Sequence, residues 1–143
     1  MFRLLVKTTS KDLDDTIFDI VRHMNIGKDL IKAKEQRHEV GELNRLAGQK
    51  AMKSFSFHSA SEYCLNAISL FGEYDNSEEQ YNCLMSIYDL ALEPLFAVGN
   101  FTALKEIIQE TLTISKNFEQ KIRANLYLIR LLVSSGKYEG ENS

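Results

Sequence analysis

Apolar residues recur with a helical period along most of the chain. Between residues 12 and 25 they stand at i, i+4, i+7, i+8 and i+11, which is one face of a helix with 3.6 residues per turn. Stripes of the same period follow over residues 36–54, 56–71, 77–98, 101–115 and 118–135. No segment alternates polar and apolar residues with a period of two over any length. The pattern predicts an all-α fold of about six helices.

Cap and turn residues mark where these helices begin and end. Ser10 is a predicted N-cap of the first helix, and Ser77 with Gln80 three residues later forms a capping-box pattern at the start of the fourth. Pro94 is expected to kink the fourth helix or to end its regular hydrogen-bond ladder. The predicted stops are Asn25 with Gly27, the GEYDNSEE break that begins at Gly72, Gly99-Asn100, Asn117, and Ser134-Ser135-Gly136.

Two glycines, Gly41 and Gly48, lie inside the second predicted helix. A glycine in a helix interior costs about 1 kcal/mol relative to alanine. We expect that the absence of a side chain at these positions lets a neighbouring helix approach closely.

Small and bulky residues recur at a fixed spacing in two consecutive helix pairs. In the first pair Gly48, Ala60, Cys64 and Ala67 stand at the offsets of the tetratricopeptide (TPR) helix–turn–helix unit, with Ala51 where an aromatic residue is usual. The second pair has residues at the same offsets, namely Tyr88, Leu92, Leu95, Gly99, Phe101, Leu104, Ile108 and Thr111.

A Gly-x-aromatic tripeptide occurs twice, as Gly99-Asn100-Phe101 and as Gly136-Lys137-Tyr138, and the two copies are 37 residues apart. This distance is close to the ~34 residues of a TPR unit. We therefore predict a TPR-like helix–turn–helix array, an α–α superhelix. An irregular helical bundle is the alternative fold.

Three longer blocks resemble one region of large signalling proteins. The blocks are IFDIVRHMNIG at 17–27, ELNRLAGQKAMKSFSFHSASEYCLNAISLF at 42–71 and YDLALEPLFAVGNFTALKEII at 88–108. Together they resemble the TPR-like helical segment that follows the AAA-type ATPase module in multidomain signalling kinases. Those proteins carry a serine/threonine-kinase-like domain in front and GAF, PAS and histidine-kinase domains behind. The resemblance covers roughly residues 12–135 and departs from the family at GEYDNSEEQY, where Tyr74 is the candidate for the usual aromatic residue.

The resemblance implies a division of the chain and a function. Residues 1–34 would be an N-terminal helix and polar link at the end of a preceding module, and residues 35–143 a TPR-like region truncated at its C-terminus. The expected function is a non-catalytic interaction or transmission module of a multidomain signal-transduction ATPase or sensor kinase, with the protein's own ATPase or kinase domains or another protein as partner. The alternative is a stand-alone TPR-like peptide-binding adaptor. An enzyme with an unrecognised site is a third possibility, and the flanking reading frame discriminates between the first two.

Net charge, hydropathy and cysteine content restrict the kinds of partner and location expected for the chain. The net charge is −3, so no bulk basicity favours nucleic acid, and no apolar run reaches the roughly 18 residues of a membrane span. Two cysteines do not make a disulfide scaffold, and unpaired thiols favour a cytoplasmic location. Residues 54–104 hold seven acidic residues and no lysine or arginine. This acidic middle contacts a basic partner, complements another part of the same molecule, or is a solvated face.

Sequence motifs of catalysis are missing from the chain. It contains no G-x-x-x-x-G-K-[ST] phosphate loop, no G-x-S-x-G, no H-E-x-x-H and no C-x-x-C. His23, His38 and His58 are 15 and 20 residues apart, too far for ligands on one helical turn, and His23 lacks the flanking pattern of a histidine-kinase dimerisation helix. We predict no catalytic residue, no cofactor and no metal site.

Four sets of residues allow two interpretations each. Cys64 and Cys83 are core thiols or a redox pair, and the carboxylates form a solvated face or an acid–base pair. The basic run is a solvated link or an anion-binding patch, and the aromatic stripe is core or a peptide groove. The carboxylates are Glu78, Glu79, Asp89 and Glu93, the basic run is Lys28, Lys32, Lys34 and Arg37, and the aromatic stripe is Tyr81, Tyr88 and Phe96.

The sixth predicted helix is expected to lack part of its cover. A helix in a repeat array buries its apolar stripe against the next repeat, and no polar capping helix is evident after this one. We expect Ile122, Leu126, Ile129 and Val133 to be about half covered and to allow self-association through the C-terminal end.

Overall fold

The computed structural model describes the backbone of residues 10–72 and 77–142 and the side chains of residues 16–72 and 77–135. These residues form six α-helices, one short 3₁₀ turn and no strand, which confirms the predicted all-α class and the number of helices. The helices are α2 (Ser10–Ile26), α3 (Lys34–Lys53), α4 (Phe57–Phe71), α5 (Glu78–Val98), α6 (Phe101–Ile114) and α7 (Phe118–Asn142), and the 3₁₀ turn η1 spans Lys28–Leu30.

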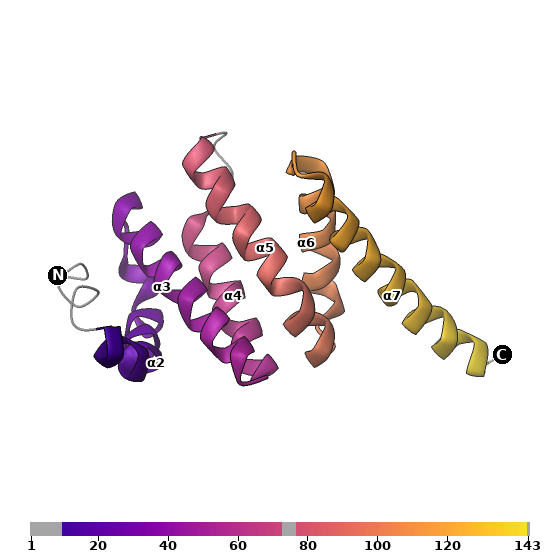
Figure 1. The fold of residues 1–143 in the computed structure, drawn as a ribbon, viewed down its shortest axis with the longest axis horizontal. Coiled ribbons are helices and arrows are strands. Elements are labelled where there is room, and N and C mark those ends of the chain that lie inside the picture. Colours follow the sequence, from indigo (N-terminus) through magenta and orange to yellow (C-terminus); the bar gives the residue numbers. More distant parts are fainter. Residues whose placement is uncertain (1–9, 73–76, 143) are drawn as a thin grey trace.

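The helices stand side by side in chain order, from α2 at one end of the row to α7 at the other (Figure 1). From α3 to α7 each helix packs against the next one, and successive helices run in opposite directions. In addition α3 contacts α5, and α5 contacts α7. The arrangement is therefore extended, and each helix is covered mainly by its near neighbours in the sequence.

The turns after α3 and α5 have the same backbone hydrogen bonds. After α5 the N–H of Asn100 donates to the carbonyl of Leu95 at 3.0 Å, and Gly99 adopts the left-handed conformation with φ 78°. After α3 the N–H of Ser56 donates to the carbonyl of Ala51 at 2.9 Å, and Phe55 occupies the left-handed position with φ 57°. Both turns are Schellman motifs, a pattern that normally places glycine at the left-handed position.

Side-chain caps explain where three helices start. The hydroxyl of Ser77 accepts from the N–H of Gln80 at 3.2 Å, which confirms the predicted cap of α5. Asn100 accepts from Ala103 at the start of α6, and the Oδ1 of Asn117 accepts from the N–H of Gln120 at the start of α7. The predicted Ser10 cap and the roles of Tyr74 and Tyr138 lie outside the described side chains.

One prediction about a helix end is wrong. The Ser134-Ser135-Gly136 segment does not end the last helix, because α7 continues to Asn142, and Gly136-Lys137-Tyr138 therefore does not form the turn found at Gly99. The physical reason is the residue after the glycine: Asn100 caps the following helix with its side-chain oxygen, whereas Lys137 has no acceptor. Pro94 lies inside α5, which continues to Val98, the end expected from the sequence.

Two groups of apolar side chains form the core. A small group joins α2 to α3 through Ile17, Val21, Leu43 and Ala47. A larger group extends from Cys64 in α4 through α5 and α6 to the Ala124 side of α7. The structure thus has a minor core at its N-terminal end and a major core across the last four helices.

Polar side chains connect helices inside this core. The Nε2 of Gln120 donates to the carbonyl of Met85 at 2.8 Å and joins α7 to α5, and the Nε2 of Gln80 donates to the carbonyl of Phe71 at 3.0 Å and joins α5 to α4. Asn44 is fully buried and exchanges two hydrogen bonds of 2.9 Å with Asn25. These bonds satisfy polar groups that would otherwise cost about 1–3 kcal/mol each when buried.

Candidate functional site

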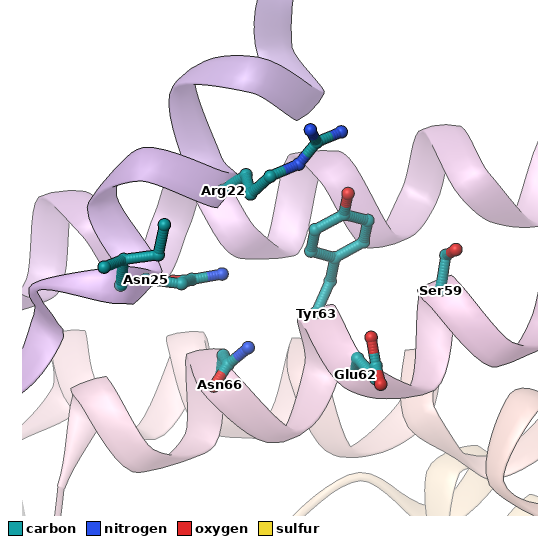
Figure 2. Close-up of a pocket in the computed structure, with 7 residues that line it drawn as sticks. Arg22, Asn25, Ser59, Glu62, Tyr63 and Asn66 are labelled. Atoms are coloured by element: carbon teal, nitrogen blue, oxygen red, sulfur yellow. The ribbon is translucent and has the colours of Figure 1, made fainter.

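A polar cavity of about 450 Å³ lies between α2 and α4. Figure 2 shows side chains of α4 rising toward Arg22 and Asn25 of α2, with Tyr63 in the centre. The lining residues are Arg22, Asn25, Ile26, Ser59, Glu62, Tyr63 and Asn66.

Neighbouring groups hold the walls of this cavity in place. The ring of Tyr63 stacks on Phe18 at a centroid distance of 5.7 Å, which fixes the position of its hydroxyl. Lys28 donates to the Oδ1 of Asn66 at 2.7 Å, and Asn25 is held by its amide pair with Asn44. Burial raises the pKa of Tyr63, so at neutral pH its hydroxyl is protonated and can donate a hydrogen bond. The cavity therefore offers a guanidinium, a carboxylate from Glu62, a phenol and amides, which suits a polar ligand.

The lining residues lie in two of the sequence blocks quoted above, 17–27 and 42–71, but no spacing connects the two blocks. Arg22 and Tyr63 are separated in the sequence by η1 and α3, and they meet because α2 lies beside α4 at this end of the row. The basic run contributes Lys28, which the structure uses as a hydrogen-bond donor to Asn66.

A second hollow, of about 660 Å³, lies between the starts of α3 and α5 and is mainly acidic. Glu42 binds the guanidinium of Arg45, and this hydrogen bond raises the pKa of the arginine. Burial, followed by the carboxylates of Glu42 and Glu79, raises the pKa of the Cys83 thiol. A protonated thiol is a poor nucleophile. The lining residues are Lys34, Glu35, His38, Glu39, Glu42, Ser77, Glu79 and Cys83.

The structure separates the three histidines and the two cysteines. His23, His38 and His58 lie on α2, α3 and α4, and within the described residues no three His, Cys, Asp or Glu side chains gather as metal ligands do. Cys64 is completely buried, and burial raises its pKa to about 12. Cys83 is half-buried on α5, and neither thiol is in a disulfide.

The other candidate sets are placed as follows. Asp89 accepts two hydrogen bonds from Arg123, at 2.8 and 3.1 Å, so one carboxylate of the acidic middle complements the basic C-terminal part of the same molecule. Arg37 donates to the carbonyls of Ile31 and Ser69 and holds the link before α3. Among the described helices none is long and apolar enough to cross a membrane.

The aromatic stripe packs between helices. Tyr88 is buried, and the ring of Phe96 contacts Phe101 and Tyr127 at centroid distances of 5.7 and 6.0 Å. The hydroxyl of Tyr81 accepts from the N–H of Lys116 at 2.7 Å. These contacts join α5 to α6 and α7, so the stripe belongs to the interhelical packing.

The outward side of α7 carries six of the eleven exposed large apolar side chains among the described residues. Ile122 is 42% exposed, Leu126 53%, Ile129 56% and Val133 61%, which confirms the expected loss of cover. Phe118 and Leu132 belong to the same side and were not singled out from the sequence.

The chain is similar to part of a known signalling protein. The chain is 32% identical over 111 residues to hybrid signal transduction histidine kinase G of Dictyostelium discoideum. The match covers 72% of this chain and 3% of that kinase. No family model matches the chain, and no solved structure matches it. The similarity confirms the histidine-kinase part of the expected resemblance.

Proposed function

We propose that this chain is a non-catalytic, TPR-like helical-repeat module that transmits signals between parts of a multidomain signal-transduction protein. Its partners would be ATPase or kinase domains of the same protein or another protein, and its location would be the cytoplasm. Residues 1–34 would then belong to the end of a preceding module.

The observation that carries this proposal is the order of helix contacts. Each helix packs on its successor, and α3, α5 and α7 also contact each other in sequence, as the first helices of stacked pairs do. Such arrays present extended surfaces on which other proteins dock. Gly41 supports the same view, because its missing side chain lets α4 lie close to α3: a Cβ on Gly41 would be 2.9 Å from the ring of Phe71.

The similarity to a hybrid signal transduction histidine kinase supports a signalling context. The matched segment is a small part of that protein, so the kinase activity of the relative is not carried over to this chain. We also propose that the chain alone binds no nucleotide, because it lacks a phosphate loop. Titration calorimetry with Mg-ATP tests this point, and micromolar binding would contradict it.

A chimera tests the transmission role. The matched segment of the Dictyostelium kinase is replaced with this chain, and histidine autophosphorylation is measured with and without stimulus. A functional module should preserve the response, whereas a helical insert of the same length and unrelated sequence should abolish it. If the unrelated insert works equally well, the segment is only a spacer.

The polar cavity between α2 and α4 favours a second candidate function, a stand-alone peptide-binding adaptor. A random-peptide display library is the probe, selected against the isolated chain. The adaptor is supported if the chain enriches peptides whose binding falls at least tenfold in Arg22→Ala and Tyr63→Phe, while Leu30→Ala, an exposed position outside the cavity, leaves it unchanged. If the enriched peptides still bind both cavity variants, the peptide-binding site lies outside this cavity.

A further inference from the structure

The outer stripe of α7 is an ordered set of exposed apolar side chains. We define it as Phe118, Ile122, Leu126, Ile129, Leu132 and Val133, whose exposed fractions run from 42% to 76%. They lie along one side of a helix that is buried on its opposite side through Ala124 and Leu131. α7 is therefore apolar on two sides, and one of them lacks a covering element among the described residues (Figure 1).

In α5, by contrast, the apolar side chains on both sides of the helix are covered by neighbouring helices. α5 lies between α4 on one side and α6 with α7 on the other. Its large side chains Leu84, Leu92 and Leu95 are at most 2% exposed. The outer stripe of α7 therefore has the composition of a surface that another helix covers.

The spacing within the stripe is symmetric. Ile122, Leu126, Ile129 and Val133 follow one another at intervals of four, three and four residues, the spacing of a heptad seam. Because this order reads the same in both directions, a second α7 in antiparallel orientation places Ile122 opposite Val133 and Leu126 opposite Ile129. Each of the four side-chain contacts along the seam of such a pair is then between two apolar residues.

The charges near the stripe and its exposed apolar area are compatible with this pairing. None of the six stripe residues is charged, and the two arginines beside the stripe are turned toward α5. Arg123 binds Asp89, and the guanidinium of Arg130 lies 4.2 Å from the ring centroid of Phe96. The stripe presents on the order of 600 Å² of apolar surface, which is below the ~800 Å² that each partner contributes to a standard interface, so we expect a weak dimer.

We propose that the outer stripe of α7 binds the same stripe of a second copy of this chain, as an antiparallel helix pair about a twofold axis between residues 127 and 128. A twofold interface requires one patch to match itself, and the stripe does so with an apolar side chain opposite an apolar side chain at every position and no charge brought against a like charge. This association goes beyond the proposed transmission role and does not depend on it.

The mass of the 143-residue chain in solution tests the proposal. Light scattering on a gel-filtration column should give a dimer at about 100 μM. Leu126→Lys and Ile129→Glu should each give a monomer, with helix content unchanged because both side chains are more than half exposed. Leu30→Lys, which adds the same charge at an 83% exposed leucine away from α7, is the matched control and should remain a dimer.

The double variant tests the orientation. In the antiparallel pair Leu126→Lys of one copy faces Ile129→Glu of the other, so the combined chain should regain at least part of the dimer that each single change removes. A monomeric wild-type chain overturns the proposal and assigns the stripe to another protein or to a further part of a longer chain. A dimer that persists in both single variants also overturns it.

Discussion

Phe55 is the one described residue other than glycine with a positive φ. Its side chain is 75% exposed, so few contacts compensate for the left-handed backbone. The same motif after α5 has Gly99 at this position, where the conformation is unstrained. Phe55 therefore occupies a position where the backbone conformation favours glycine.

Replacing Phe55 with glycine should stabilise the protein. The left-handed conformation costs a non-glycine residue about 1–2 kcal/mol, and the greater freedom of glycine in the unfolded chain cancels part of the gain, so Phe55→Gly should raise the free energy of unfolding by about 0.5–1 kcal/mol. Urea denaturation measures the change. Gly99→Ala, the reciprocal control, should lower it by about 1 kcal/mol or more. A loss of stability in Phe55→Gly would show that the exposed ring makes stabilising contacts.

Cys64 links stability to alkaline pH. Burial raises the pKa of its thiol from 9.0 to about 12, so the folded chain holds this proton after the unfolded chain has released it. The contribution of the thiol is complete below pH 9, and the free energy of unfolding then falls by about 1.4 kcal/mol per pH unit toward pH 12. Urea denaturation at several pH values should show a smaller slope between pH 9 and 11 in Cys64→Ala. Equal slopes in both chains would contradict the assigned burial.

At the scale of the helix, the two glycines of α3 have different surroundings. A Cβ on Gly41 would be 2.9 Å from the buried ring of Phe71, whereas a Cβ on Gly48 would be 3.4 Å from the sulfur of Cys64 and from Leu90. The first distance is a clash and the second an ordinary contact. Only Gly41 is therefore required for the approach of α4.

Alanine at the two positions should have opposite effects. Gly41→Ala should lower the free energy of unfolding by about 1–2 kcal/mol, because the displaced ring costs more than the gain in helix propensity. Gly48→Ala should raise it by up to about 1 kcal/mol, since the propensity gain meets no clash. Thermal unfolding followed by circular dichroism compares the pair. Stabilisation by Gly41→Ala would mean that Phe71 relaxes freely.

Periodicity predicted the helices and their order, because an apolar stripe reports which side of a helix is buried. It failed at the end of α7, which continues past Gly136, where Lys137 cannot cap a following helix as Asn100 caps α6. The cavity of Arg22 and Tyr63 was also beyond sequence reasoning. Its residues come from helices whose contact depends on packing, and no fixed spacing connects them.

At the scale of the molecule, the two cores divide the row of helices. The minor core between α2 and α3 contains four buried side chains, and the major core spans α4 to α7. In an array whose elements contact mainly their neighbours, stability is a sum of local terms, and the ends open before the centre. We therefore expect the slowest amide hydrogen exchange in α5, which has neighbours on both sides, and faster exchange in α2.

Two core substitutions test this division. Val21→Ala removes a fully buried side chain from the minor core and should accelerate exchange in α2 by about tenfold or more while α5 and α6 keep their rates. Leu84→Ala, in the major core, should accelerate exchange from α4 to α7 together, since these helices share one packed interior. Mass spectrometry of exchanged peptides measures both variants. If Val21→Ala accelerates α5 as much as α2, the helices unfold as a single cooperative unit, and a description as locally stabilised repeats is wrong.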